Sequence, residues 1–90
     1  MKREEIFRSA IAQYGKTAQM VVAMEEMAEL TKELSKNLRT GDNEDAIAEE
    51  IADVRIMLEQ LEIMFDCAGA AAAYKAAKVE RLRKRLEDNE

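Results

Sequence analysis

Two segments of the chain repeat one arrangement of acidic side chains. Residues 25–29 read Glu-Glu-Met-Ala-Glu, and residues 49–53 read Glu-Glu-Ile-Ala-Asp. Side chains three positions apart on a helix are neighbours, and this spacing pairs Glu26 with Glu29 and Glu50 with Asp53. Two such helices packed antiparallel would bring four carboxylates together. Hard divalent cations such as Mg²⁺ and Mn²⁺ prefer oxygen ligands of this kind, so the spacing predicts a divalent-metal site.

The charge distribution around these segments favours the same interpretation. Three acids and no base lie between Lys16 and Lys32, and six acids and no base lie between Arg39 and Arg55. Like-charged neighbours on an exposed helix cost about a few tenths of a kcal/mol per pair, and desolvation increases that cost. A bound cation would remove the repulsion. The alternative is a solvated acidic face, because Glu-x-x-Glu occurs in any glutamate-rich helix.

Helices are expected to position these acids. The chain of 90 residues has no proline and three glycines, and 48% of its residues are hydrophobic, a composition that predicts no strand. Apolar spacings of three and four predict a first helix over residues 3–14, closed by Gly15. They predict a second helix from an N-cap at about Thr17 to Arg39, followed by Gly41 as a terminating glycine.

A third and a fourth helix complete the predicted domain, which spans residues 1–90. The third follows a cap at Asp42 or Asn43 and reaches about Phe65, and the fourth follows Gly69. The predicted apolar stripes are Met20, Met24, Met27, Thr31, Leu34 and Leu38 on the second helix, Ile47, Ile51, Val54, Leu58 and Leu61 on the third, and Val79, Leu82 and Leu86 on the last. Ile56 and Ile63 project from the opposite side of the third helix, which predicts a subunit interface there. The expected fold is therefore an all-α bundle of about four helices per chain, completed by oligomerisation.

Missing residue types exclude several kinds of chemistry. The chain has no histidine, which excludes serine–histidine and cysteine–histidine catalysis and imidazole-rich zinc sites. Its single cysteine, Cys67, cannot form an internal disulfide and is expected to be a small buried hydrophobe in a cytoplasmic protein. The net charge of −5 argues against nucleic-acid or membrane partners, and no apolar run approaches transmembrane length.

The two acidic segments resemble the motif of a known family, the all-α nucleoside triphosphate pyrophosphohydrolases typified by MazG. The family's relatives include dimeric dUTPases, dCTP pyrophosphatases and phosphoribosyl-ATP pyrophosphatase. Its pattern is Glu-Glu-x-x-Glu, a variable spacer and then Glu-x-x-Asp, which here corresponds to residues 25–29, twenty intervening residues, and residues 50–53. The resemblance covers about residues 10–86 and implies a MazG-like helical bundle.

The resemblance implies Mg²⁺-dependent cleavage of a nucleoside triphosphate between its α- and β-phosphates, which yields the monophosphate and pyrophosphate. It implies four metal ligands, Glu26, Glu29, Glu50 and Asp53, with Mn²⁺ as a possible substitute for Mg²⁺. Because the chain has no histidine, a carboxylate is the expected proton acceptor. Glu25 and Glu49 are the candidates for that role or for support of the ligands.

A polyanionic substrate also needs cations and a base pocket. Six of the fourteen basic residues lie between Lys75 and Arg85, and the family has basic residues on a late helix. The expected phosphate-binding residues are Lys75, Lys78 and Arg81, and the expected base-binding residues are Tyr14 and Gln19. Met57 stands where some relatives have an aromatic residue, so the nucleobase is left open.

Three functions remain open from the sequence. The first is a homodimeric or homotetrameric pyrophosphohydrolase that acts on a nucleoside or deoxynucleoside triphosphate. The second is a non-catalytic helical module for oligomerisation or partner binding, whose acids form a solvated face. The third is an enzyme similar to phosphoribosyl-ATP pyrophosphatase.

Overall fold

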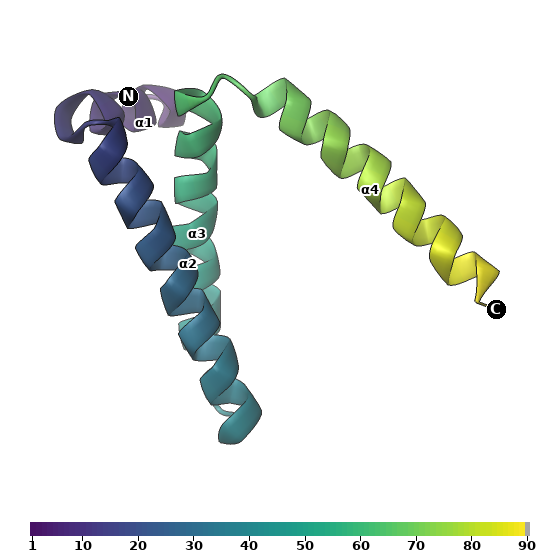
Figure 1. Cartoon of the computed structure of the whole chain (residues 1–90). Helices are drawn as coiled ribbons and strands as arrows, with labels where there is room; N and C mark the ends of the chain where they lie inside the picture. Colours follow the sequence, from purple (N-terminus) through teal and green to yellow (C-terminus); the bar gives the residue numbers. More distant parts are fainter. Residues whose placement is uncertain (90) are drawn as a thin grey trace.

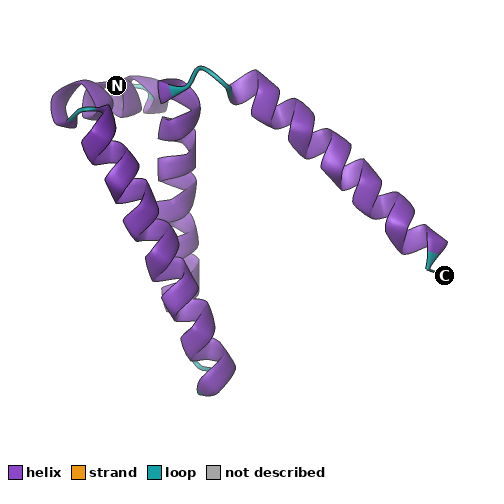
Figure 2. Ribbon diagram, in the orientation of Figure 1, coloured by secondary structure: helices purple, strands orange, loops and turns teal. Residues whose placement is uncertain are grey.

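The computed structural model describes residues 1–89 and contains four helices. They are α1 (Arg3–Tyr14), α2 (Lys16–Arg39), α3 (Glu44–Met64) and α4 (Ala68–Asp88). No strand occurs within residues 1–89 (Figure 2), which confirms the all-helical prediction. The long helices α2 and α3 form an antiparallel pair, α1 crosses one end of it, and α4 diverges from it (Figure 1).

Glycine ends two of the helices, as predicted. Gly15 has φ 92°, and its N–H donates to the carbonyl oxygen of Ile11 at the end of α1. Gly41 has φ 69°, and its N–H donates to the carbonyl oxygen of Asn37 at the end of α2. Glycine adopts these left-handed conformations without the steric cost that other residues incur.

Two predictions about helix starts need correction, and a third is confirmed in part. Thr17 is not the N-cap of α2, because the carbonyl oxygen of Gly15 already accepts the N–H of Gln19 and the helix begins at Lys16. Gly69 lies inside α4, which begins at Ala68. Asn43 occupies the N-cap position of α3, but its side chain makes no capping bond there.

The face that joins α2 to α3 also differs from the prediction. The residues between the two helices, here called the packed stripes, are Gln19, Ala23, Glu26, Leu30, Glu33 and Asn37 on α2, and Ala46, Glu50, Asp53, Met57, Gln60 and Met64 on α3. Each stripe has spacings of three and four and precedes the predicted apolar stripe by one residue. That offset corresponds to a rotation of about 100°.

The predicted apolar stripes are consequently left on the surface. Both helices are rotated by the same amount from the predicted orientation. Because α2 and α3 are antiparallel, these rotations turn both predicted apolar stripes to the same side of the pair. The resulting surface, here called the α2–α3 apolar face, consists of the exposed residues Met20, Met24, Met27, Leu34, Leu38, Ile51 and Leu58. The other expected core residues of α3 are half-buried, as are Ile63 and Cys67, while Ile56 is exposed. Cys67 is therefore less buried than predicted.

A single chain is more extended than a compact domain of its size. Its accessible surface is 7119 Å², against about 5,300 Å² expected for a folded monomer of its mass. Its radius of gyration is 16.3 Å, against about 12 Å expected. The projecting helix α4 contains no buried residue. Within residues 1–89 no helix has both the length and the apolarity needed to cross a membrane.

Candidate metal centre

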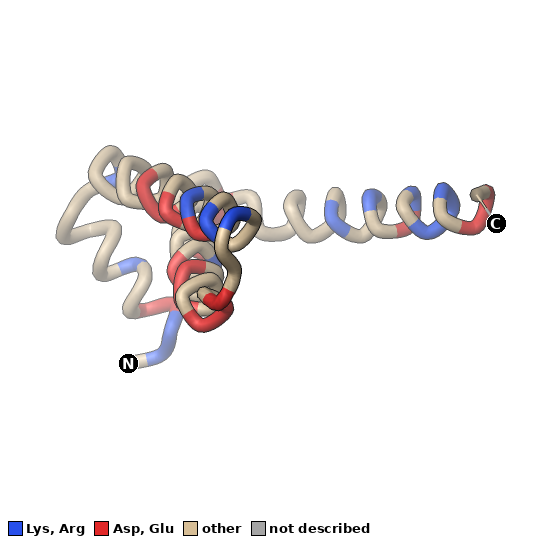
Figure 3. Tube along the Cα trace, turned by 90° about the horizontal axis from the view of Figure 1, so that it is seen from below, with Lys and Arg blue, Asp and Glu red and all other residues tan. Residues whose placement is uncertain are grey.

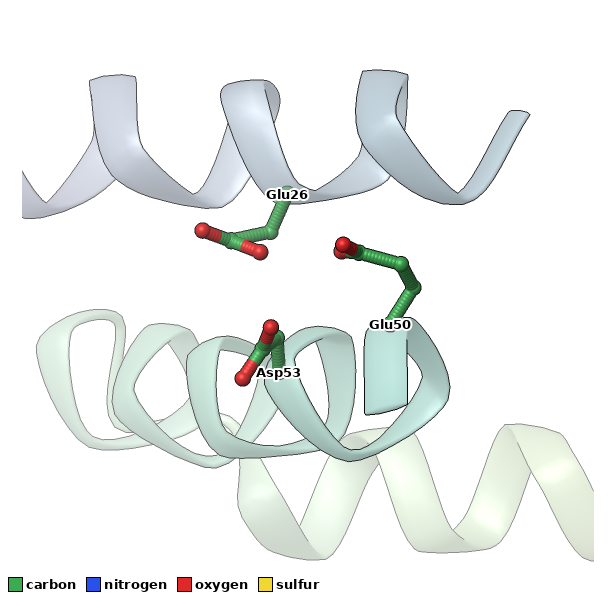
Figure 4. A group of neighbouring side chains, drawn as sticks. All are labelled: Glu26, Glu50 and Asp53. Atoms are coloured by element: carbon green, nitrogen blue, oxygen red, sulfur yellow. The ribbon is translucent and has the colours of Figure 1, made fainter. Parts of the chain in front are cut away.

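Three carboxylates meet between α2 and α3. Glu26 projects from α2, and Glu50 and Asp53 project from adjacent turns of α3 (Figure 4). Each residue offers one oxygen, and these three oxygens lie within 4.8 Å of one another. All three residues are half-buried. The i,i+3 spacing on α3 and the antiparallel pairing of the helices together produce this cluster, here called the carboxylate cluster.

The surroundings of Glu50 disfavour the charged form of its carboxylate. Its Oε2 atom is buried and has no hydrogen-bond partner in the described part of the chain. Desolvation raises the pKa of Glu50, and the neighbouring charges of Glu26, Asp53 and Glu29 raise it further. Both effects disfavour the charged form of a carboxylate, so this carboxylate favours a proton or a cation beside it.

No base in the described part of the chain forms an ion pair with the carboxylate cluster. Over residues 1–89 the ion pairs join Arg3 to Glu59, Arg8 to Glu4, and Arg83 to Glu80 and Glu87. Acidic residues gather along the α2–α3 pair, whereas the charged residues of α4 are mostly basic (Figure 3). A buried acid without a base usually finds another source of positive charge.

The residues present fit a hard divalent cation. Carboxylate oxygens are the preferred ligands of Mg²⁺ and Mn²⁺, and the unpartnered Oε2 of Glu50 is available to coordinate a metal ion. Glu26, Glu50 and Asp53 are therefore the residues that could hold such an ion. Three protein ligands would leave positions for water and for substrate oxygens, which is usual for Mg²⁺.

The other predicted acids lie outside the carboxylate cluster. Glu29 is exposed, since a shift of three residues from Glu26 turns its side chain about 60° away from α3. It acts on the cluster only through its charge, which contributes to the raised pKa of Glu50. Glu25 and Glu49, each one residue before a cluster member, are exposed on the surface of their helices.

The predicted substrate-binding residues are not assembled in one chain. Lys75, Lys78 and Arg81 are exposed on α4, and α4 packs only against α3 (Figure 1). Tyr14 is 62% exposed at the end of α1. Gln19 is buried, and its Nε2 donates a 2.7 Å hydrogen bond to Oε1 of Gln60. Its amide is therefore occupied within the helix pair.

A second set of polar residues, not predicted from the sequence, also joins the two helices. Gln60 is the partner of Gln19. Near the opposite end of the pair, Nδ2 of Asn43 donates to the backbone oxygen and to Oε1 of Glu33, each at 2.9 Å, and Oδ1 of Asn43 accepts from Asn37 at 2.9 Å. Their signal in the sequence is a heptad-like spacing of polar residues, with Gln19, Glu26 and Glu33 seven apart.

Comparison of the chain with protein-family models, with curated proteins and with solved structures found no significant match.

Proposed function

We propose that this protein is a Mg²⁺-dependent nucleoside triphosphate pyrophosphohydrolase, which converts a nucleoside or deoxynucleoside triphosphate to the monophosphate and pyrophosphate. The observation that carries the proposal is the convergence of Glu26, Glu50 and Asp53 without a neutralising base, with one oxygen of Glu50 buried and unpartnered. The similarity of residues 25–29 and 50–53 to the MazG motif supports this choice of reaction.

The residues of the chain have distinct roles in this proposal. Glu26, Glu50 and Asp53 hold the cation, and Glu29 strengthens the negative potential around it. When bound, the cation neutralises the triphosphate, polarises the α-phosphorus and lowers the pKa of a bound water. Glu25 and Glu49 are the candidates for the proton acceptor or for support of the ligands. Mn²⁺ is expected to substitute for Mg²⁺.

Product analysis tests the proposal. The purified protein is incubated with Mg²⁺ and a panel of nucleoside and deoxynucleoside triphosphates, with phosphoribosyl-ATP included, and pyrophosphate is resolved from orthophosphate. We expect a monophosphate and pyrophosphate from at least one substrate. Turnover of phosphoribosyl-ATP alone would assign the third function raised by the sequence.

A pair of variants distinguishes the loss of a metal ligand from the loss of a negative charge elsewhere on α3. Glu50→Gln should lower turnover by more than about a hundredfold, because even groups that merely support metal ligands contribute about ten- to a hundredfold. Glu44→Gln, an exposed change in the first turn of the same helix, removes the same charge and should leave turnover unchanged. Equal losses in both variants would contradict the assignment.

A second candidate function is a helical interaction module without catalysis. The observation that favours it is the exposed α2–α3 apolar face, since a large apolar surface commonly marks an interaction site. Absence of turnover with every substrate, together with a melting temperature that Mg²⁺ and Mn²⁺ leave unchanged, would select this function over the enzyme.

A further inference from the structure

Helix α4 presents an apolar stripe that nothing within residues 1–89 covers. Val79, Leu82 and Leu86 lie on one side of the helix at spacings of three and four, and they are 58%, 48% and 59% exposed. No residue of Ala68–Asp88 is buried. A helix of 21 residues gains most of its stability in a protein from packing such a stripe, so the stripe of α4 lacks a packing partner in the described chain.

The surface in excess of a compact monomer is enough for an extensive interface. One chain exposes 7119 Å², which is about 1,800 Å² more than a folded monomer of this mass. A stable interface of standard size covers about 800 Å² on each partner. Burial of the excess would therefore more than satisfy the area that a stable dimer needs.

Charge selects the α2–α3 pair of another copy as the partner of α4. Helix α4 carries six bases and three acids, a net charge of +3, while α2 and α3 together carry five bases and eleven acids, a net charge of −6. Opposite net charges draw α4 toward an α2–α3 pair over distances longer than contact. The α2–α3 apolar face supplies exposed methionine, leucine and isoleucine side chains for the stripe to bury.

The same charges disfavour pairing of α4 with a second α4. Lys75 lies within the stripe, and Lys78 and Arg85 flank it on the helix surface. A symmetric pair of α4 helices would place these bases near one another across the contact. Like charges that flank a helix interface oppose association.

The junction between α3 and α4 opposes the alternative in which α4 folds back along its own chain. The N–H of Asp66 donates to the carbonyl oxygen of Ile63 at 3.2 Å, and that of Cys67 donates to Glu62 at 3.0 Å. Immediately afterwards, the N–H of Ala71 donates to the carbonyl oxygen of Cys67 at 2.8 Å. These bonds hold the backbone on both sides of Cys67, so only the φ and ψ angles of Cys67 could turn α4 back along its own chain without breaking them.

We propose that α4 is an exchanged arm: in a homodimer, α4 of each copy packs its Val79–Leu86 stripe on the α2–α3 apolar face of the other copy. The exchange is reciprocal and closes on itself with two-fold symmetry. It buries both unpartnered apolar surfaces at once. The proposal does not rest on the proposed enzymatic activity, and neither of its tests measures turnover.

The first test combines mass measurement with isotope mixing. Light scattering should give twice the 10.2 kDa of one chain. Isotopically light and heavy protein are then mixed, dissociated, allowed to reassociate and treated with a zero-length amine–carboxyl cross-linker. We expect peptides that join Lys78 to an acid of α2 or α3 to contain one light and one heavy partner. A monomeric mass, or such cross-links in same-isotope pairs alone, would overturn the proposal.

The second test changes the stripe and compares it with the opposite side of α4. The double variant Leu82→Gln/Leu86→Gln should halve the mass in solution. The control Glu80→Gln/Lys84→Gln alters the other side of the helix without changing net charge and should remain dimeric. A dimer that survives in the leucine variant would show that α2–α3 faces pair directly, without α4. Circular dichroism confirms that both variants keep their helix content.

Discussion

Nε2 of Gln19 donates a 2.7 Å hydrogen bond to Oε1 of Gln60, and both side chains are buried between α2 and α3. This pair lies at one end of the packed stripes, the hydrogen bonds of Asn43 lie near the other end, and the carboxylate cluster lies between them. Buried polar partners favour one alignment of two helices over its alternatives. The two ends therefore determine which acids of α2 and α3 face each other.

The amide pair predicts a non-additive response to mutation. Gln60→Leu leaves the buried amide of Gln19 without its partner and should lower the free energy of unfolding by about 1–3 kcal/mol. The double variant Gln19→Leu/Gln60→Leu removes both polar groups and should be close to the wild type in stability. Urea unfolding of the four proteins in the cycle measures the coupling. Additive effects would show that the two amides act independently.

The sequence predicted the helices well because their ends depend on local chemistry. Gly15 and Gly41 adopt left-handed conformations that favour glycine, so their positions mark helix ends without knowledge of the tertiary structure. The predicted ends at Tyr14, Arg39 and about Phe65 agree with the structure to within one residue. Gly69 was misleading because its φ is not left-handed and nothing there interrupts the helix.

The face of each helix was harder to predict because it depends on the partner. Met20 belongs to a more hydrophobic stripe than Gln19, yet Gln19 is buried and Met20 is exposed in a single chain. A hydrophobic pattern identifies which face of a helix is to be buried, but it does not show whether the same chain or a second chain buries it. If a second copy covers the apolar stripes, the polar packed stripes are the contact within one chain. Three of the four predicted acids nevertheless meet. The i,i+3 spacing keeps Glu50 and Asp53 on one side of α3 whichever face is packed, and the antiparallel pairing brings Glu26 of α2 to them.

Asn43 is predicted to be important for the stability of the α2–α3 connection. Its side chain bonds to Glu33 and Asn37 on α2 while its backbone begins α3. Asn43→Ala removes these bonds and leaves half-buried polar groups of Glu33 and Asn37 unpaired, which should lower the free energy of unfolding by about 1–3 kcal/mol. Thr40→Ala, which removes one exposed hydroxyl bond to Lys36, should change it by less than about 0.5 kcal/mol. Equal effects in the two variants would contradict this role.

The raised pKa of Glu50 predicts a pH-dependent difference between Glu50→Gln and the wild type. The folded state of the wild type binds a proton at Glu50 at pH values where the unfolded chain, with its ordinary pKa of 4.5, has lost it. The contribution of Glu50 to the free energy of unfolding of the wild type therefore falls as the pH rises from 4.5 through the pKa of Glu50 in the folded state. Thermal melts in the presence of a chelator measure the difference. The stability of Glu50→Gln relative to the wild type should increase across that pH interval and stay constant above it. A difference independent of pH would contradict the raised pKa.

Divalent cations are predicted to stabilise the folded state through the carboxylate cluster. A ligand that binds only the folded state at one hundred times its dissociation constant stabilises it by about 2.7 kcal/mol. For a domain of this size, that corresponds to a rise of about 10 °C or more in the melting temperature. Differential scanning fluorimetry with Mg²⁺ or Mn²⁺ measures the rise, with KCl at matched ionic strength as the reference. Glu50→Gln and Asp53→Asn should each abolish most of the rise, while Glu44→Gln should retain it. A rise that persists in both cluster variants would place the bound cation elsewhere on the acidic surface.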